Sequence, residues 1–293
     1  MPDGADHHVA DIGRAAAEAL RFEAVEEGAE ADLVIAAGAR LDGISSEEFK
    51  FLDPTQPLLH IFPDDDVLAR WTSNLAIRAD VGPTLDALAA AVARPSAERR
   101  AWVERCHAAY DAFARPGGLE IYGKVDLSAV VAEVQRQARD DAIILTDSGT
   151  FARWVHRFYR FNRPHTQAGP MCGAMGYAMP GALGAAMAWP DRQVIAFVGD
   201  GGFLMSGQEI ATAVQHRLPV QLIVCDNNAW GSILVSQQRR FGEEGTFGTR
   251  LQSPDFAALG GGLYTPQFII SSAVTIAFGV TMFPQVNQRF FVA

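Results

Sequence analysis

The stretch VIAFVGDGGFLMSGQEIATAVQHRLPVQLIVCDNNAW, residues 194–230, decides the fold. Two apolar runs, 194–198 and 220–225, are typical of buried strands, and a helical pattern over about residues 206–216 separates them. Such a unit predicts two parallel strands joined by a helical crossover. The carboxyl ends of both strands then lie at the same edge of the sheet, which is where open α/β sheets bind ligands.

The same alternation of strands and helices extends along the chain in both directions. Further apolar runs predict strands at 33–37, 58–62, 76–79 and 142–146. Helical patterns cover residues 83–93, 96–114, 127–139 and 150–159. Strands that are apolar throughout predict an α/β fold in which a parallel sheet carries helices on both faces. The segment from Pro116 to Lys124, which opens with Pro-Gly-Gly, is the best domain boundary.

Polar residues follow both strands of the quoted stretch. Asp200 comes directly after the first strand, and Asn227 comes shortly after the second. Neighbouring strands lie about 4.8 Å apart, so a carboxylate and an amide oxygen at their ends can reach one ion. The main-chain carbonyl of Ala229 can supply a third oxygen. Few carboxylates, oxygen ligands only and vacant positions favour Mg²⁺ completed by phosphate oxygens over a closed Ca²⁺ cage.

Glycines stand on both sides of Asp200. Because Gly199, Gly201 and Gly202 have no side chains, main-chain N–H groups can approach a phosphate, and the start of the following helix favours negative charge. A GDG turn or an Asn-Asn loop alone is usually structural, but together, at the ends of two strands, they indicate a ligand site. A dinucleotide fingerprint is excluded because Leu204 stands where its third glycine belongs.

Composition and charge exclude several classes of protein. The 293 residues include 24 Lys and Arg against 34 Asp and Glu, a net charge of −10, so we expect no binding to nucleic acid. Segment 1–20 has acidic residues where a signal peptide needs basic ones, and it has no apolar run. Cys106, Cys172 and Cys225 lack metal-binding spacing and are interpreted as reduced thiols. These features predict a cytoplasmic protein.

With these features the sequence resembles the thiamine-diphosphate-dependent enzymes, and among them the acetolactate synthase large subunits and 2-oxo-acid decarboxylases. The resemblance runs from about Ala31 to Leu259, and the quoted stretch is its most specific part. It implies that Asp200, Asn227 and the carbonyl of Ala229 hold Mg²⁺ on the cofactor's diphosphate.

Two further segments carry the resemblance. GAMGYAMP, residues 173–180, looks like the family's pyrimidine-binding stretch. It implies that the carbonyl of Gly173 accepts from the 4′-amino group and that Met175 supports the bent cofactor. TDSGTF, residues 146–151, resembles a diphosphate-contacting turn with Gly149 and Thr150. The remaining residues implied to bind the cofactor are Gly199, Gly201, Gly202 and Asn228.

The resemblance implies decarboxylation of a 2-oxo acid, followed by protonation or carboligation, so the family is one of lyases and transferases. That chemistry needs a glutamate which, in the family, lies on a separate pyrimidine-binding domain and is normally supplied by a partner subunit. We expect this chain to lack that domain. We therefore assign no catalytic residue, and we expect the isolated chain to be inactive and to form oligomers or to need a partner chain. The alternatives are a non-catalytic remnant or interaction subunit, and one chain of a split two-subunit enzyme.

The resemblance also divides the chain. Residues 1–115 are interpreted as the second half of the Rossmann-like central domain, 116–124 as a linker and 125–259 as the thiamine-diphosphate and Mg²⁺ domain. Because half of the central domain is not found, we predict no flavin. Residues 260–293 form an atypical apolar tail with a single charge, Arg289. Its uncharged run 268–283 is short for a membrane span of about 20 residues. We hypothesise that a frameshift or misplaced gene end produced this tail.

Overall fold

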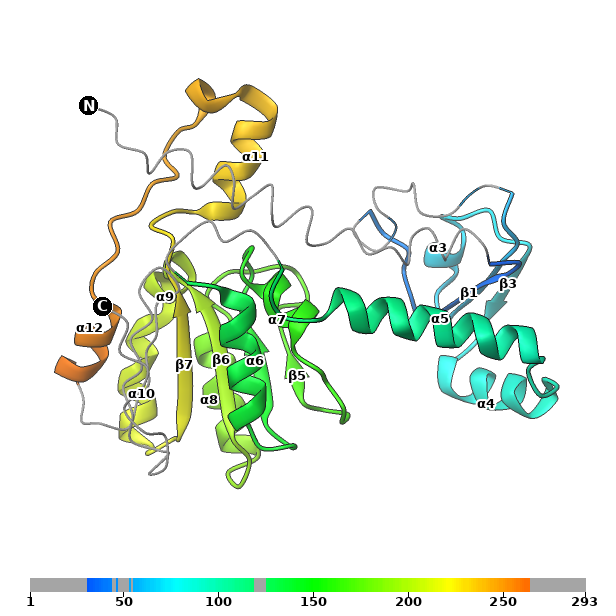
Figure 1. Ribbon diagram of the computed structural model, residues 1–293, viewed down its shortest axis with the longest axis horizontal. Helices are drawn as coiled ribbons and strands as arrows, with labels where there is room; N and C mark the ends of the chain where they lie inside the picture. Colours follow the sequence, from blue (N-terminus) through cyan, green and yellow to red (C-terminus); the bar gives the residue numbers. More distant parts are fainter. Residues whose placement is uncertain (1–30, 44–45, 47–52, 54, 119–124, 264–293) are drawn as a thin grey trace. The chain divides into compact units, whose positions relative to one another are not determined.

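The computed structural model of the chain describes residues 31–43, 46, 53, 55–118 and 125–263 (Figure 1). The chain divides into two compact units, one ending at Phe113 and the other beginning at Ala114. Both contain a parallel sheet with helices, which confirms the predicted α/β class. Of the predicted tail, only residues 260–263 are described, and they belong to a helix; the rest lies outside the described residues.

The unit that begins at Ala114 is built on a sheet of four parallel strands in the order β5-β4-β6-β7. The strands are β4 (Ile143–Thr146), β5 (Gln167–Ala168), β6 (Val194–Gly199) and β7 (Val220–Cys225). The pair β6 and β7 is the predicted crossover unit, and its register places Gly199 opposite Cys225. The last residues of the two strands are therefore neighbours, so the turns that follow them begin side by side.

Helices cover both faces of this sheet (Figure 1). One face carries α6 (Leu127–Gln137) and α7 (Ala152–Phe158), and the other carries α8 (Ala178–Ala188), α9 (Asp200–Ser206), α10 (Ile210–Gln215) and α12 (Phe256–Leu263). Successive strand residues point to opposite faces. In β4, Ile143 and Leu145 pack with α8, whereas Ile144 packs with α6 and α7. Both faces are buried at β4, β6 and β7, which explains why these three strands are almost entirely apolar.

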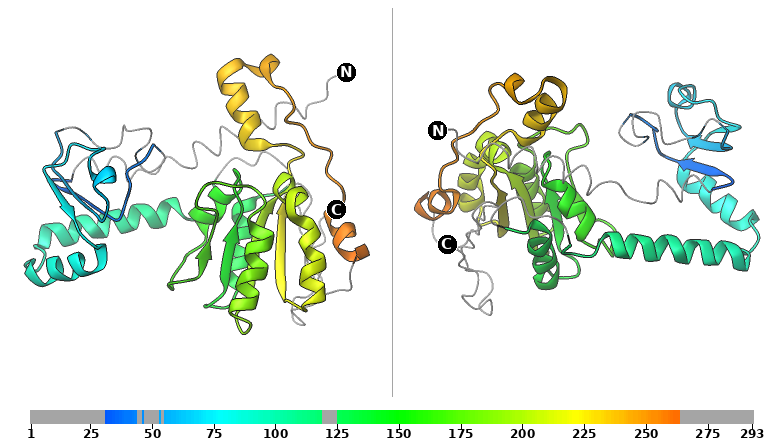
Figure 2. Two further views of the ribbon diagram at one scale, coloured as in Figure 1. Left: turned by 180° about the vertical axis from the view of Figure 1, so that it is seen from behind. Right: turned by 45° about the horizontal axis from the view of Figure 1, so that its top comes forward.

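Helix α11 (Gly231–Phe241) lies beyond the carboxyl end of β7 rather than on a face of the sheet (Figure 2). The 3₁₀ turn η2 (Glu243–Gly245) follows it. The chain then returns toward β7, where the Leu251 N–H donates to the carbonyl of Asn228 at 2.8 Å. This return brings residues 249–253 onto the turn that follows β7.

The start of the helix after β6 differs from the prediction. We expect a helix at about 206–216, but α9 begins at Asp200, and the 3₁₀ turn η1 (Gly207–Glu209) separates it from α10. Glycine is a poor helix former, so Gly201 and Gly202 favour a loop when the sequence is taken alone. Both residues nevertheless lie in α9, and glycine is required there because a side chain at either position would collide with a neighbouring residue.

The unit that ends at Phe113 has three parallel strands in the order β1-β2-β3. They are β1 (Val34–Ala37), β2 (Leu58–Phe62) and β3 (Leu75–Arg78), joined with the helices α3 (Asp65–Leu68), α4 (Val81–Ala91) and α5 (Ala97–Phe113). Polar side chains cap two of these helices: Asp64 accepts from the Asp66 N–H at 2.8 Å, and Ser96 accepts from the Arg99 N–H at 3.1 Å. Helix α4 begins two residues before the predicted start, with Asp80 at its N-cap.

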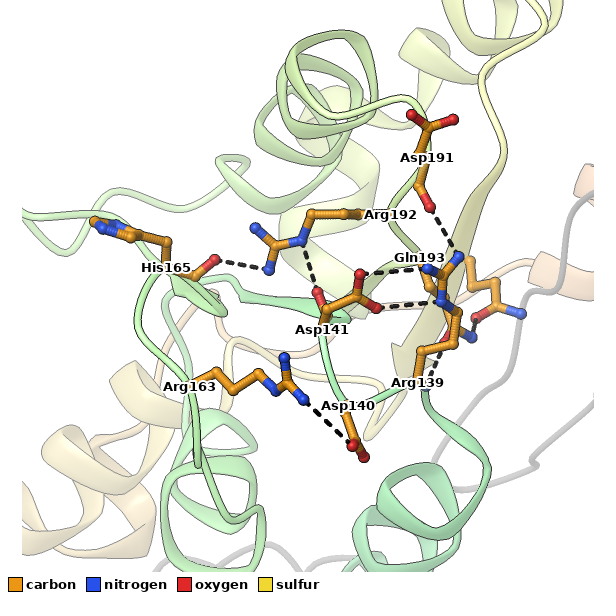
Figure 3. Close-up of polar contacts among 9 residues, drawn as sticks. Arg139, Asp140, Asp141, Arg163, His165, Asp191, Arg192 and Gln193 are labelled. Carbon is orange, nitrogen blue, oxygen red and sulfur yellow. Dashed lines mark hydrogen bonds and ion pairs between the residues drawn. The ribbon is translucent and has the colours of Figure 1, made fainter.

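A polar network joins the amino ends of the strands (Figure 3). The Arg192 guanidinium donates to the carbonyls of Asp141, at 2.7 Å, and His165, at 2.9 Å. Each of these three residues lies two positions before a strand: β6, β4 and β5, respectively. Arg139 donates in the same way to the carbonyl of Asp191 at 2.8 Å. The network therefore fixes the edge of the sheet opposite the turns that follow β4, β6 and β7.

In the part of the chain that is described, no helix is long and apolar enough to cross a membrane.

Candidate cofactor site

Three buried aspartates follow three neighbouring strands at the carboxyl edge of the sheet. Asp147 follows β4, Asp200 follows β6 and Asp226 follows β7. Their exposed fractions are 1%, 3% and 9%. Only Asp200 is a ligand predicted from the sequence. A buried carboxylate is costly unless hydrogen bonds or a cation compensate it, so each must be accounted for.

Main-chain and side-chain donors surround the Asp200 carboxylate. Its Oδ1 accepts from the Gly201 N–H at 2.9 Å, and its Oδ2 accepts from the Ala229 N–H at 3.2 Å and the Ser253 hydroxyl at 3.4 Å. Burial, together with the neighbouring Asp226 carboxyl group, raises the pKa of Asp200 to about 7. An isolated negative charge is therefore disfavoured here, and a cation at this position would favour the ionised form.

The side chain of Asn227 points to the same place as that of Asp200. Its Oδ1 accepts from the Ala229 N–H at 3.2 Å, so a single N–H is shared by the two side-chain oxygens. The carbonyl of Ala229 accepts from the Gly231 N–H at 2.8 Å and keeps a second lone pair. The structure thus brings together the three residues predicted to be metal ligands.

Asn228 and Ser253 lock the turn that carries Asn227. Asn228 has a positive φ of 54°, which asparagine tolerates better than most residues. Its Oδ1 accepts from the Ser253 N–H at 3.1 Å, and its own N–H donates to Asp226 at 2.9 Å. The Ser253 hydroxyl also donates to Asp226, at 2.8 Å. Asn228, predicted to bind the cofactor, is therefore engaged in holding the turn, and Ser253 is a contributor that the sequence does not reveal.

Asp147 holds the turn after β4 to the segment predicted to bind the pyrimidine. Its Oδ1 accepts from the N–H groups of Ser148, at 2.8 Å, and Tyr177, at 3.2 Å, and its Oδ2 accepts from the Gly176 N–H at 2.8 Å. Burial raises the pKa of Asp147, and these three N–H groups act in the opposite direction. Although Asp147 lies in the motif TDSGTF, nothing in the sequence shows that it contacts residues about thirty positions away.

The glycines predicted to approach the cofactor are close to other residues of the protein. A Cβ on Gly201 would lie 2.2 Å from the Trp230 ring, and one on Gly202 would lie 2.3 Å from Asp147 Oδ2. A Cβ on Gly149 would lie 2.5 Å from the Phe151 ring, which also packs near Gly199. These positions therefore need glycine for packing, whatever they bind.

Thr150 and Gly173 connect the remaining predicted positions to this edge. A Cβ built on Gly231 would lie 2.7 Å from Asn227 Nδ2 and 3.7 Å from Thr150 Oγ1, which places Thr150 beside the predicted metal ligands. Gly173, with a φ of 68°, would bring a Cβ within 3.9 Å of the Ser148 hydroxyl. Met175 directly precedes the anchored Gly176 and is 36% exposed, so its side chain is available to a ligand.

The donor set fits a hard divalent cation. Among the described residues, no three His, Cys, Asp or Glu side chains form a metal-binding group. Asp200, Asn227 and the Ala229 carbonyl would instead supply one carboxylate, one amide oxygen and one main-chain oxygen. Mg²⁺ prefers such oxygen ligands and completes its shell with water or phosphate oxygens.

The comparisons with known proteins agree with this geometry. Residues 147–273 match the family described as thiamine pyrophosphate enzyme, C-terminal TPP binding domain. Acetolactate synthase isozyme 1 large subunit of Escherichia coli is 36% identical over 228 residues, which are 74% of this chain and 38% of that protein. The chain belongs to the thiamine-diphosphate-dependent enzyme family. Membership supports thiamine diphosphate and Mg²⁺ as the cofactors, as predicted. The match extends past Gly260, where we expect the resemblance to stop.

Another member of the family shows the same partial coverage. The acetolactate synthase large subunit of Parasynechococcus marenigrum is 32% identical over 240 residues, 78% of this chain and 38% of that protein. The chain thus spans about two fifths of the length of the curated relatives that it matches. A solved thiamin diphosphate-dependent enzyme from Mycobacterium smegmatis superposes with a TM-score of 0.59 at 22% identity, covering 82% of this chain and 43% of that one. This likeness supports the fold.

Proposed function

We propose that the carboxyl edge of the β5-β4-β6-β7 sheet holds Mg²⁺ and the diphosphate of thiamine diphosphate. The observation that carries the proposal is the convergence of Asp200 and Asn227 on the Ala229 N–H, each at 3.2 Å. Sharing this N–H holds two oxygen ligands from neighbouring strand ends close together. A cation bound beside them would also compensate the buried charge of Asp200.

The residues around this point have separate tasks. Asp200, Asn227 and the Ala229 carbonyl would hold the metal, while the Thr150 hydroxyl and main-chain N–H groups at Gly149 and at the glycines around Asp200 would bind the diphosphate. Gly173 and Met175 would receive the pyrimidine. When bound, the cofactor supplies the electron sink for chemistry on 2-oxo acids. The protein's own share is to orient it and to keep its charged end neutralised.

We further propose that this domain serves an acetolactate-synthase-like enzyme, a lyase or transferase acting on 2-oxo acids. The support is the 36% identity to the Escherichia coli large subunit and the family match over residues 147–273. We also propose, as the family resemblance implies, that a partner chain supplies the activating glutamate, so the working site would lie between subunits.

A calorimetric titration of the full chain with thiamine diphosphate tests the cofactor proposal. We expect saturable binding that requires Mg²⁺ and disappears in Asp200→Ala. Arg192→Ala is the control, because it removes hydrogen bonds at the opposite edge of the sheet and should leave binding unchanged. Binding that persists in Asp200→Ala, or that does not need Mg²⁺, contradicts the proposal.

Pyruvate consumption tests the proposal about activity. We expect no turnover by the chain alone and turnover when a chain carrying a pyrimidine-binding domain is added. Turnover by the chain alone would show that the activating group is already present. Cofactor binding with no turnover in either case would favour the non-catalytic alternative.

A further inference from the structure

We propose that Asp147 is a positioning residue that sets the shape of the pyrimidine-binding segment and ties it to the diphosphate-binding helix α9. This inference rests on the proposed function. Asp147 accepts hydrogen bonds from Ser148, Gly176 and Tyr177 rather than from the proposed metal ligands or diphosphate glycines. We infer that it acts through residues 173–177.

The contacts of Asp147 are directed at one short segment. Two of the three N–H groups that its carboxylate accepts belong to Gly176 and Tyr177, at 2.8 and 3.2 Å. These residues directly follow Met175 and stand three and four positions after Gly173. The position of the Gly173 carbonyl, the proposed acceptor for the 4′-amino group, therefore depends on a peptide chain anchored at its far end by Asp147.

The backbone of this segment needs such an anchor. Both Gly173 and Gly176 have positive φ values, 68° and 82°, so the segment turns sharply at each of them. Glycine adopts this region readily but also leaves it readily, because it has no side chain that restricts it. The bond from the Gly176 N–H to a buried carboxylate fixes one of the two turns. A charged acceptor makes this bond stronger than a neutral one would be.

Asp147 also contacts α9. A Cβ on Gly202 would lie 2.3 Å from Asp147 Oδ2, the oxygen that accepts from the Gly176 N–H, so the carboxylate fills the space that this glycine leaves. Gly176 also packs on α9, since a Cβ there would lie 3.2 Å from the Met205 Cβ. The same carboxylate thus contacts the segment proposed to bind the ring and the helix proposed to bind the diphosphate. It sets the spacing between the two ends of the cofactor.

Asp147→Asn separates these two roles. Asparagine has the same size and still fills the space beside Gly202. However, its amide group replaces one acceptor oxygen, so the Gly176 N–H loses its partner when the amide occupies the Oδ2 position. We therefore expect the ring-binding segment to loosen while the diphosphate-binding turn remains in place.

Binding of two probes in the presence of Mg²⁺ tests this expectation. Asp147→Asn should bind thiamine diphosphate about tenfold or more weakly, because a charge-assisted hydrogen bond is lost. It should bind inorganic diphosphate, which has no ring, as well as the unmodified chain does. Equal weakening of both probes, or unchanged binding of thiamine diphosphate, overturns the inference. If the unmodified chain binds neither probe, the proposed function itself fails.

Two measurements separate positioning from a general loss of stability. Arg192→Ala is a destabilised control whose changes lie at the opposite edge of the sheet, and it should bind both probes normally. Amide hydrogen exchange in the unmodified, cofactor-free chain needs no variant at all. The Gly176 and Tyr177 amides should be protected although they lie outside any helix or strand. Exchange at the rate of free loop amides contradicts the inference.

Discussion

The main-chain N–H of Ala229 donates to the carboxylate of Asp200 at 3.2 Å, across 29 residues of chain. This bond joins the turn after β6 to the turn after β7, and the same N–H is shared with Asn227. The fold itself therefore holds the proposed metal ligands together.

Asp200→Asn should stabilise the cofactor-free protein at pH 8. The pKa of Asp200 is raised to about 7, so the folded state retains a proton that the unfolded chain releases near its ordinary value of 3.8. Stability contributed by that proton is complete below pH 4 and is lost as the pH rises toward 7. Asparagine has no charge to bury, so we expect its free energy of unfolding at pH 8 to be higher by on the order of 1–3 kcal/mol in chemical denaturation.

With thiamine diphosphate and Mg²⁺ present, the unmodified chain should become more stable than Asp200→Asn, because only the unmodified chain gains from binding. A less stable cofactor-free Asp200→Asn at pH 8 would refute this explanation.

Adjacent asparagines should respond differently to substitution. Asn227→Ala removes a proposed metal ligand and should weaken Mg²⁺-dependent binding, while Asn228→Ala should mainly lower the free energy of unfolding. The latter loss should be about 1–2 kcal/mol, since alanine does not favour the positive φ of 54° at this position. Asn228→Gly should recover part of it. Thermal unfolding and cofactor titration of the three variants check these expectations, and a similar binding loss in all three would contradict the division of roles.

Gly201→Ala should destabilise the protein only while Trp230 is present. The new Cβ would lie 2.2 Å from the indole ring, and overpacking of this kind costs about 1–3 kcal/mol. In a Trp230→Ala background the collision disappears, and alanine is the better helix former in α9, so the change should be neutral or stabilising. A double-mutant cycle by urea denaturation measures this coupling. Additive effects would show that the contact does not constrain residue 201.

Ser253→Ala should weaken the brace on the turn after β7. The hydroxyl donates to Asp226 at 2.8 Å and to Asp200 at 3.4 Å. Loss of a hydrogen bond to a charged group should lower the free energy of unfolding by about 1–2 kcal/mol. Ser253→Thr, which keeps a hydroxyl, serves as the control and should retain most of the stability. Equal stability of Ser253→Ala and the unmodified chain would show that the hydroxyl contributes little.

Strands β4, β6 and β7 could be predicted because burial on both faces makes them almost entirely apolar. The two-residue strand β5 carries no such pattern and was not predicted. The start of α9 could not be predicted, because Gly201 and Gly202 disfavour a helix locally and only their neighbours in space explain their place in one. Asp200 and Asn227 could be predicted as partners because a crossover unit fixes which strand ends meet.

Other parts of the site depend on contacts between distant segments. Asp147 reaches Gly176, and Ser253 reaches Asp226, across 29 and 27 residues. No periodicity or spacing in a single sequence records such contacts. Asn228 shows that residue type can also mislead. Asparagine is a suitable ligand, yet its side-chain oxygen here accepts a hydrogen bond from the Ser253 N–H.

The central claim is that Asp200 and the diphosphate hold one divalent cation together. Electron paramagnetic resonance of Mn²⁺, used in place of Mg²⁺ with the full chain, measures this directly, because bound Mn²⁺ loses the sharp signal of the free ion. Thiamine diphosphate alone also binds Mn²⁺, so the protein's share is the fall beyond that given by the cofactor without protein. We expect this further fall in the unmodified chain and in Arg192→Ala but not in Asp200→Ala. A further fall that is absent in the unmodified chain, or that is equal in Asp200→Ala, would contradict the claim.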